Sequence, residues 1–77
     1  MQELPVLKLR TLLATLSQLG FSIESQRGSH IKLKKRAESK VLVVIVPAHT
    51  EIRRGTLLSI IKQAGLTREA FLKLLDK

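Results

Sequence analysis

The two histidines of this 77-residue chain, His30 and His49, are its side chains best suited to proton transfer at neutral pH. An imidazole changes charge at a pH of about 6.5, inside the physiological range. His30 ends the tripeptide Gly28-Ser29-His30, and His49 ends the segment Val46-Pro47-Ala48-His49. Glycine and proline beside them favour a turn and the end of a strand. The pair is therefore the first candidate for acid-base catalysis.

For His30 we weigh two interpretations. As a general base or acid in RNA cleavage, its imidazole takes the proton of a ribose 2′-hydroxyl so that the oxygen attacks the adjacent phosphate, a contribution of roughly 10²- to 10⁴-fold in rate. Gly28 lets the backbone approach a phosphate closely, and the Ser29 hydroxyl donates to it. In the competing interpretation, His30 is a solvated polar residue at the start of a strand.

His49 has the same two kinds of interpretation. It lies just past Pro47, in a loop that leads into a predicted helix. A second proton carrier or a phosphate contact is one hypothesis. The other is a polar loop residue bonded to backbone groups, because loops hold both kinds of residue. Sequence spacing alone does not place His49 within reach of His30.

A strong positive charge points to a polyanionic partner. Fourteen Lys and Arg against six Asp and Glu give a net charge of +8 and a pI near 10.7, which makes nucleic acid the leading partner class and an anionic membrane surface its rival. Eight cations lie in the stretch 27–54, which contains both histidines: Arg27, Lys32, Lys34, Lys35, Arg36, Lys40, Arg53 and Arg54. We predict that RNA contacts Arg27, Gly28, Ser29, Lys32, Lys34, Lys35, Arg53 and Arg54.

Composition argues against several other chemistries. The chain has no cysteine, and its six acidic residues are scattered, so we expect no thiolate zinc site, no carboxylate cage and no cofactor. Its only aromatic residues, Phe21 and Phe71, fit core positions, which leaves no base-stacking platform. The longest apolar run, 41–46, is too short to span a bilayer. Residues 1–5 lack a basic region followed by a long apolar run, so we expect no signal peptide. We therefore expect a cytoplasmic protein.

Hydrophobic periodicity predicts the elements that position these residues. Leucines at three- and four-residue steps indicate a helix over 8–19 before Gly20. Alternation predicts strands over 21–26 and 30–35 around a turn at 27–29, then a hairpin loop at 36–39. The apolar run 41–46 is predicted as a central strand ended by Pro47, and 51–55 as polar connection. Helices are predicted over 56–64 and after Thr67, a candidate N-cap.

The predicted order of helices and strands places a row of basic residues on an exposed face of the sheet. We expect a single α+β domain over residues 1–77, in which helices from both ends of the chain cover one face of a three-stranded antiparallel sheet. His30, Lys32 and Lys34 alternate with Ile31 and Leu33 and so share the open face. Three apolar residues of 41–46 must join them there. An exposed apolar patch beside a basic row is typical of a binding surface.

Four sequence blocks, in order, resemble the HicA family of toxins from bacterial and archaeal toxin-antitoxin pairs. They cover nearly the whole chain: Leu19-Gly20-Phe21; Gln26-Arg27-Gly28-Ser29-His30; Val46-Pro47-Ala48-His49; and Arg54-Gly55-Thr56-Leu57-Leu58-Ser59-Ile60 with Lys62-Gln63-Ala64-Gly65-Leu66. The resemblance implies a fold similar to a double-stranded-RNA-binding domain, α-β-β-β-α, here with an extra short C-terminal helix. It also implies a ribosome-independent mRNA endonuclease, with His30 at the position of the catalytic histidine.

The same resemblance implies a partner, an antitoxin similar to HicB that covers the active face. This chain departs from the family in two places. Leu7-Lys8 stand where the family often has a Ser-Gly pair, and the hairpin between the second and third strands is long and basic. Both departures concern RNA contacts and leave the histidine motif unchanged.

Two other function classes remain open. A non-catalytic RNA-binding module with the same fold would bind in a salt-dependent way without cutting the strand. A DNA-binding or corepressor role is weaker, because no predicted helix carries a dense basic face suited to a major groove. The leading hypothesis is a metal-independent endoribonuclease toxin that acts on mRNA.

Overall fold

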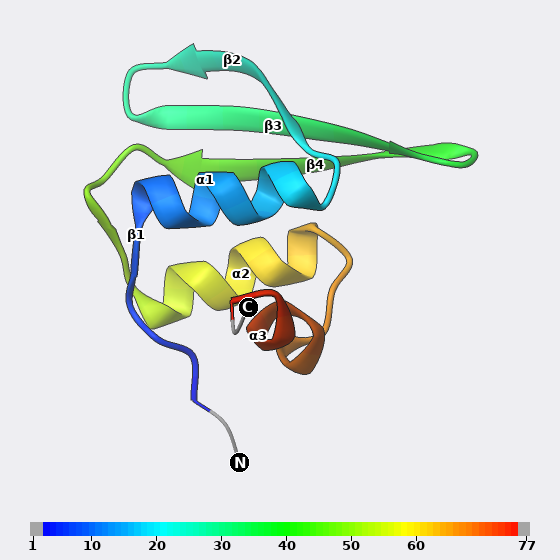
Figure 1. Cartoon of the computed structure of the whole chain (residues 1–77). Helices are drawn as coiled ribbons and strands as arrows, with labels where there is room; N and C mark the ends of the chain where they lie inside the picture. Colours follow the sequence, from blue (N-terminus) through cyan, green and yellow to red (C-terminus); the bar gives the residue numbers. More distant parts are fainter. Residues whose placement is uncertain (1–2, 76–77) are drawn as a thin grey trace.

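The computed structural model describes residues 3–75 and shows an α+β fold (Figure 1). A three-stranded antiparallel sheet lies on a layer of helices, as predicted. The elements in chain order are β1 (Leu7–Lys8), α1 (Leu9–Gln18), β2 (Ser22–Arg27), β3 (His30–Ala37), β4 (Lys40–Pro47), β5 (Glu51–Ile52), α2 (Arg54–Gln63) and α3 (Arg68–Leu75).

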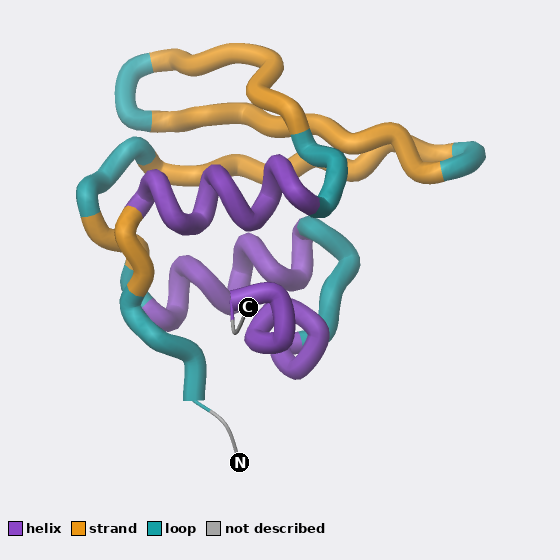
Figure 2. The backbone as a smooth tube through the Cα atoms, viewed as in Figure 1, coloured by secondary structure: helices purple, strands orange, loops and turns teal. Residues whose placement is uncertain are grey.

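The main sheet is a meander of two tight hairpins in the order β2-β3-β4 (Figure 2). The first hairpin turns at Gly28 and Ser29, so that Arg27, predicted in the turn, is the last residue of β2 and pairs with His30. The second turns at Glu38 and Ser39, two residues fewer than the predicted loop. Strand pairing thus runs further toward both turns than alternation alone indicated.

Strand β4 lies at an edge of the sheet, and the prediction of a central strand is wrong. Its β-branched residues fill both faces, but β3 is the strand with two neighbours. Pro47 belongs to β4 and pairs with His30, which an edge strand tolerates because proline offers no N–H to a further strand. The Ile45 N–H at this edge donates to the Gln63 Oε1 of α2 at 2.9 Å.

The core lies between the sheet and the helices. Strands β3 and β4 each supply alternate apolar residues to it, and α1 and α2 supply one face each. Buried side chains include Leu12 and Leu16 of α1, Ile31 and Leu33 of β3, Val44 and Val46 of β4, Leu57, Ile60 and Ile61 of α2, and Phe71 of α3. All six residues of β2 are exposed, so the prediction of a half-buried strand is wrong for this edge, which the core does not reach.

A second, two-stranded sheet joins the segment before α1 to the segment before α2. Leu7 pairs with Ile52 and Lys8 with Glu51, and the Leu9 N–H donates to the Thr50 carbonyl at 2.9 Å. Strands this short are not long enough to show a periodic pattern in the sequence. Residues 51–55, predicted as polar connection, therefore contain β5 and the first two residues of α2.

The helix ends follow the predicted signals. Gly20 and Gly65 have φ angles of +102° and +76°, the left-handed conformation that ends α1 and α2. The Ala70 N–H donates to the Thr67 Oγ1 at 3.1 Å, which confirms Thr67 as the N-cap of α3. Within residues 3–75, no helix is long and apolar enough to cross a membrane.

Candidate functional site

His30 is the first residue of β3 and lies at the end of the sheet, where its side chain is exposed. It pairs with Arg27 of β2 on one side and with Pro47 of β4 on the other. Directly paired residues of antiparallel strands share a face. Arg27 and His30 therefore lie together on the sheet face away from the helices.

The turn before His30 is held to the loop that carries His49. Gly28 has a φ of +54°, which favours glycine at the first central position of a two-residue hairpin turn. No atom lies within 4 Å of the position that a Cβ on Gly28 would take, so the turn is open to an incoming group. The Ala48 N–H donates to the Ser29 carbonyl at 2.6 Å.

This hydrogen bond brings both histidine segments to the same end of the molecule. His49 is exposed and lines a surface hollow of about 400 Å³. Arg53, Thr56, Glu51, Ile52 and Pro47 also line the hollow, and His30 does not. The structure thus places His49 and Arg53 in a hollow next to the His30 turn.

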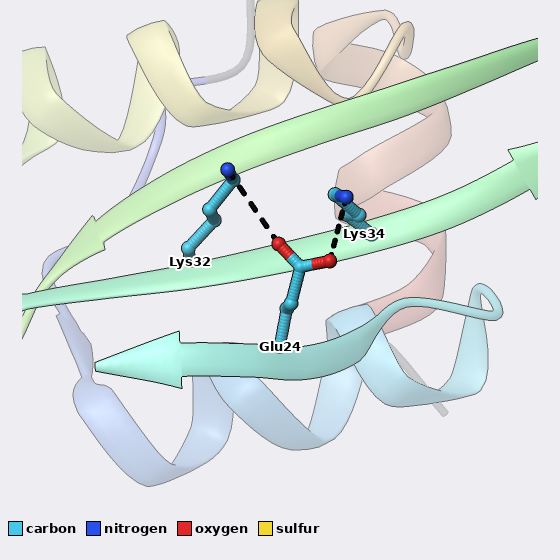
Figure 3. A network of polar contacts seen from close by, with 3 residues as sticks. All are labelled: Glu24, Lys32 and Lys34. Atoms are coloured by element: carbon cyan, nitrogen blue, oxygen red, sulfur yellow. Dashed lines mark ion pairs between the residues drawn. The ribbon is translucent and has the colours of Figure 1, made fainter.

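Lys32 and Lys34 extend the His30 row along β3. Ile31 and Leu33 between them are buried, so the two lysines lie on the open face, as predicted. Both contact Glu24 of β2: its carboxylate lies 3.5 Å from the Lys32 Nζ and 2.6 Å from the Lys34 Nζ (Figure 3). The hydrogen bond from Lys34, helped by the positive charge of both lysines, lowers the pKa of Glu24.

Arg27 reaches this face because β2 contains a bulge. The register between β2 and β3 shifts between Ile23 and Ser25, which leaves Glu24 as the extra residue. Strict alternation from Ile23 would have placed Arg27 on the helix side. The extra residue reverses the alternation, so Arg27 and Glu24 both face the open side.

The structure does not bring Lys35 to the predicted RNA surface. Lys35 follows the alternation of Ile31 and Leu33 and lies on the opposite face from His30. Its Nζ lies 5.9 Å from the centroid of the Phe21 ring, a cation–π contact over a core aromatic. Lys35 therefore has a packing role, and the alternation of β3 already contained that signal.

Arg54 is also apart from the predicted surface. Its Nε donates to the Leu4 carbonyl at 2.6 Å, which ties the segment before β1 to the start of α2. Arg53 is exposed at the N-cap position of α2 and lines the His49 hollow. Of this pair, only Arg53 adds a positive charge near the histidine end of the sheet.

An apolar row runs beside the basic row on the open face. Val41, Val43 and Ile45 of β4 are 51%, 37% and 39% exposed. In the β3–β4 register, Val43 pairs with Lys34 and Ile45 with Lys32. The predicted division of this strand between two faces is confirmed. The open face is thus cationic over β3 and apolar over β4.

Sequence reasoning missed Glu24 as a residue of the site. The acidic residues are scattered in the sequence, yet this one contacts both lysines of the basic row. The signal was a register conflict. A two-residue turn at Gly28-Ser29 without a bulge would pair Glu24 with Leu33 and turn its carboxylate toward the helix side of the sheet, away from Lys32 and Lys34. Among residues 3–75, no three His, Asp or Glu side chains gather as metal ligands would.

Comparison with known proteins identifies one family. The family model of the HicA toxin of bacterial toxin-antitoxin systems matches residues 9–66. That range runs from the start of α1 to just past α2 and includes the whole three-stranded sheet. A comparison with curated proteins finds no significant match.

Proposed function

This chain belongs to the HicA toxin family of toxin-antitoxin systems, and we propose that it is a metal-independent endoribonuclease that cleaves mRNA by histidine acid-base catalysis. The observation that carries the proposal is the position of His30. It is exposed, lies beside an open glycine turn, and begins a row of cations on the uncovered sheet face. A phosphate bound at this turn would lie beside an imidazole.

In the proposed reaction, His30 accepts the proton of a ribose 2′-hydroxyl. The 2′-oxygen then forms a bond to the adjacent phosphorus while the bond from phosphorus to the 5′-oxygen breaks. The leaving oxygen takes up a proton, for which His49 is the candidate donor because its loop is bonded to the Ser29 carbonyl. The products are a 2′,3′-cyclic phosphate and a 5′-hydroxyl. Gly28 and Ser29 shape the phosphate site.

The RNA backbone is proposed to follow β3. Alternate residues of a strand lie about 6.7 Å apart, a spacing comparable to that of successive phosphates in an extended single strand. Lys32 and Lys34 continue the row that His30 and Arg27 begin. Arg53 is proposed to contribute from the neighbouring hollow, whereas Lys35 and Arg54 are left out because of their positions.

The antitoxin partner is proposed to cover this same open face. Val41, Val43 and Ile45 form an exposed apolar row, and cations of β3 lie beside it in register. An antitoxin similar to HicB, with apolar and acidic side chains at its contact surface, would bury the first row and pair with the second. Its binding would exclude RNA. Rescue of growth on co-expression, abolished by Val43→Lys, tests this arrangement.

The direct test is cleavage of RNA by the purified protein with a metal chelator present. We expect cleavage by the wild type and a fall of at least about 100-fold in His30→Ala, the lower end of the range for general acid-base catalysis. A smaller fall is expected in His49→Ala. The thermal unfolding of both variants should match the wild type. Full activity of His30→Ala would refute the assignment.

A second candidate function is an RNA-binding module without catalysis. Among the described residues, the His30 imidazole makes no hydrogen bond to a side chain that would orient it, whereas a catalytic base commonly has such a partner. The same assay separates the two functions. Binding that weakens with salt while the RNA stays intact would support the module.

A further inference from the structure

Glu24 is the only acidic residue in the three strands of the main sheet. It lies on the open face among cations, and its carboxylate oxygens contact one lysine each: Oε1 with Lys32 and Oε2 with Lys34 (Figure 3). A carboxylate in this position presents oxygens where a phosphate would present them.

A bulge in β2 places the Glu24 side chain on the open face of the sheet. Glu24 is the extra residue of the β2 bulge, and bulges beside functional sites commonly re-aim a side chain. Without the bulge, Glu24 would pair with Leu33, which is buried. The same irregularity turns Arg27 toward His30. One local feature therefore sets both a cation of the proposed RNA surface and the acid that neutralises part of it.

We propose that Glu24 is an internal competitor for phosphate, which holds Lys32 and Lys34 in the free protein and must release them when RNA binds. The inference rests on the proposed function and adds to it, because it names the residue that limits the affinity of the surface. With Glu24 in place, the two lysines and the carboxylate carry a net charge of +1. Without the carboxylate the two lysines carry +2, so RNA can place up to one further phosphate against this surface.

The competition is expected to operate throughout the neutral range. The hydrogen bond from Lys34 lowers the pKa of Glu24 from an already acidic value, so the carboxylate stays ionised at neutral pH. Its depressed pKa also means that the ion pairs break only as the pH falls through that low value. Protonation of Glu24 therefore does not release the lysines at neutral pH, whereas a competing anion such as a phosphate can take its place.

The test compares Glu24→Gln with Glu69→Gln. Glutamine keeps the size of the side chain, and both variants raise the net charge by one. Glu69 is exposed in the first turn of α3, away from the open face. The probe is a fluorescein-labelled single-stranded RNA with 2′-O-methyl riboses, which the proposed reaction does not cleave. Fluorescence anisotropy gives its affinity between about 50 and 200 mM salt.

We expect Glu24→Gln to bind the probe about three- to tenfold more tightly than the wild type at low salt. Its plot of log affinity against log salt should be steeper by about 0.7, the value for one neutralised phosphate on a single strand. Glu69→Gln should match the wild type in both respects. If Glu24 only stabilised the hairpin, its variant would unfold at a lower temperature and bind equally or more weakly.

The outcomes separate this inference from the proposed function. If Glu24→Gln binds the probe equally or more weakly while the wild type binds and cuts RNA, the proposal that Glu24 competes with phosphate is wrong. The proposed endoribonuclease function is then unaffected. Equal tightening in both variants would also overturn the proposed competition, because net charge alone would explain the change. If neither the wild type nor any variant binds the probe, the proposed RNA surface fails and the competitor fails with it.

Discussion

The two faces of the main sheet are built from the same strands but meet different surroundings. On the helix side, Ile31 and Leu33 of β3 pack with Val44 and Val46 of β4 in a buried core. On the open side, alternate residues of β3 are cations, which lie beside exposed apolar residues of β4. Burial of apolar side chains on the helix side stabilises the fold. The exposed cations and apolar residues on the open side are available to bind a partner.

One strand can therefore carry stability and function on separate residues. A substitution on the helix side of β3 should change the free energy of unfolding and alter RNA binding only through it. A substitution on the open side should change RNA binding and leave the free energy of unfolding almost unchanged, because exposed side chains contribute little to packing. Substitutions on each face, and in the turns that join the strands, test this separation.

Leu33→Ala should cause the largest decrease in stability. Leu33 is 2% exposed at the centre of the sheet, and truncating such a residue leaves a cavity that costs about 2 to 5 kcal/mol. Urea unfolding followed by circular dichroism measures the change. Any fraction that remains folded should bind RNA as the wild type does. A folded Leu33→Ala protein that no longer binds RNA would break the separation of the two faces.

Replacing Lys32 and Lys34 together by alanine should weaken RNA binding about tenfold at low salt. The salt dependence should become shallower by about 0.7 for each phosphate that the variant no longer neutralises. The matched control replaces Lys62 and Lys73, exposed lysines of α2 and α3. Equal weakening by both pairs would mean that net charge, and not the open face, attracts RNA. Unfolding free energies should stay within about 0.5 kcal/mol of the wild type.

The turns at the two ends of β3 extend the comparison. Gly28 and Glu38 both have positive φ, +54° and +55°, but only glycine adopts this conformation without a steric cost. Glu38→Gly should therefore stabilise the protein by about 0.5 to 1 kcal/mol, partly offset by greater freedom in the unfolded chain. Thermal unfolding measures the change. A destabilised variant would show that the Glu38 side chain contributes more than its backbone costs.

Elements with a long and regular pattern could be predicted from the sequence alone. The alternation of β3 was enough to place His30, Lys32 and Lys34 on one face. Leucine spacing indicated α1, and Thr67 marked the start of α3. In each case one period, or one capping side chain, decides the local structure without help from distant residues.

Features that depend on distant pairing were missed. β1 and β5 are two residues each and exist because they pair with one another. The apolar run of β4 predicted a central strand, but in the part of the chain that the structure describes no further strand pairs with its outer edge. The Gln63 side chain of α2 accepts a hydrogen bond from that edge. The bulge at Glu24 becomes visible only when the turn register is compared with burial across β2 and β3.

The central claim is that His30 activates a ribose 2′-hydroxyl at the end of the basic row. Its most direct test is to identify the ends of the RNA fragments produced by the wild type and by His30→Ala in the presence of chelator. We expect 2′,3′-cyclic phosphate and 5′-hydroxyl ends from the wild type, and almost no fragments from the variant. Fragments with 5′-phosphate ends, or equal cleavage by His30→Ala, would contradict the claim.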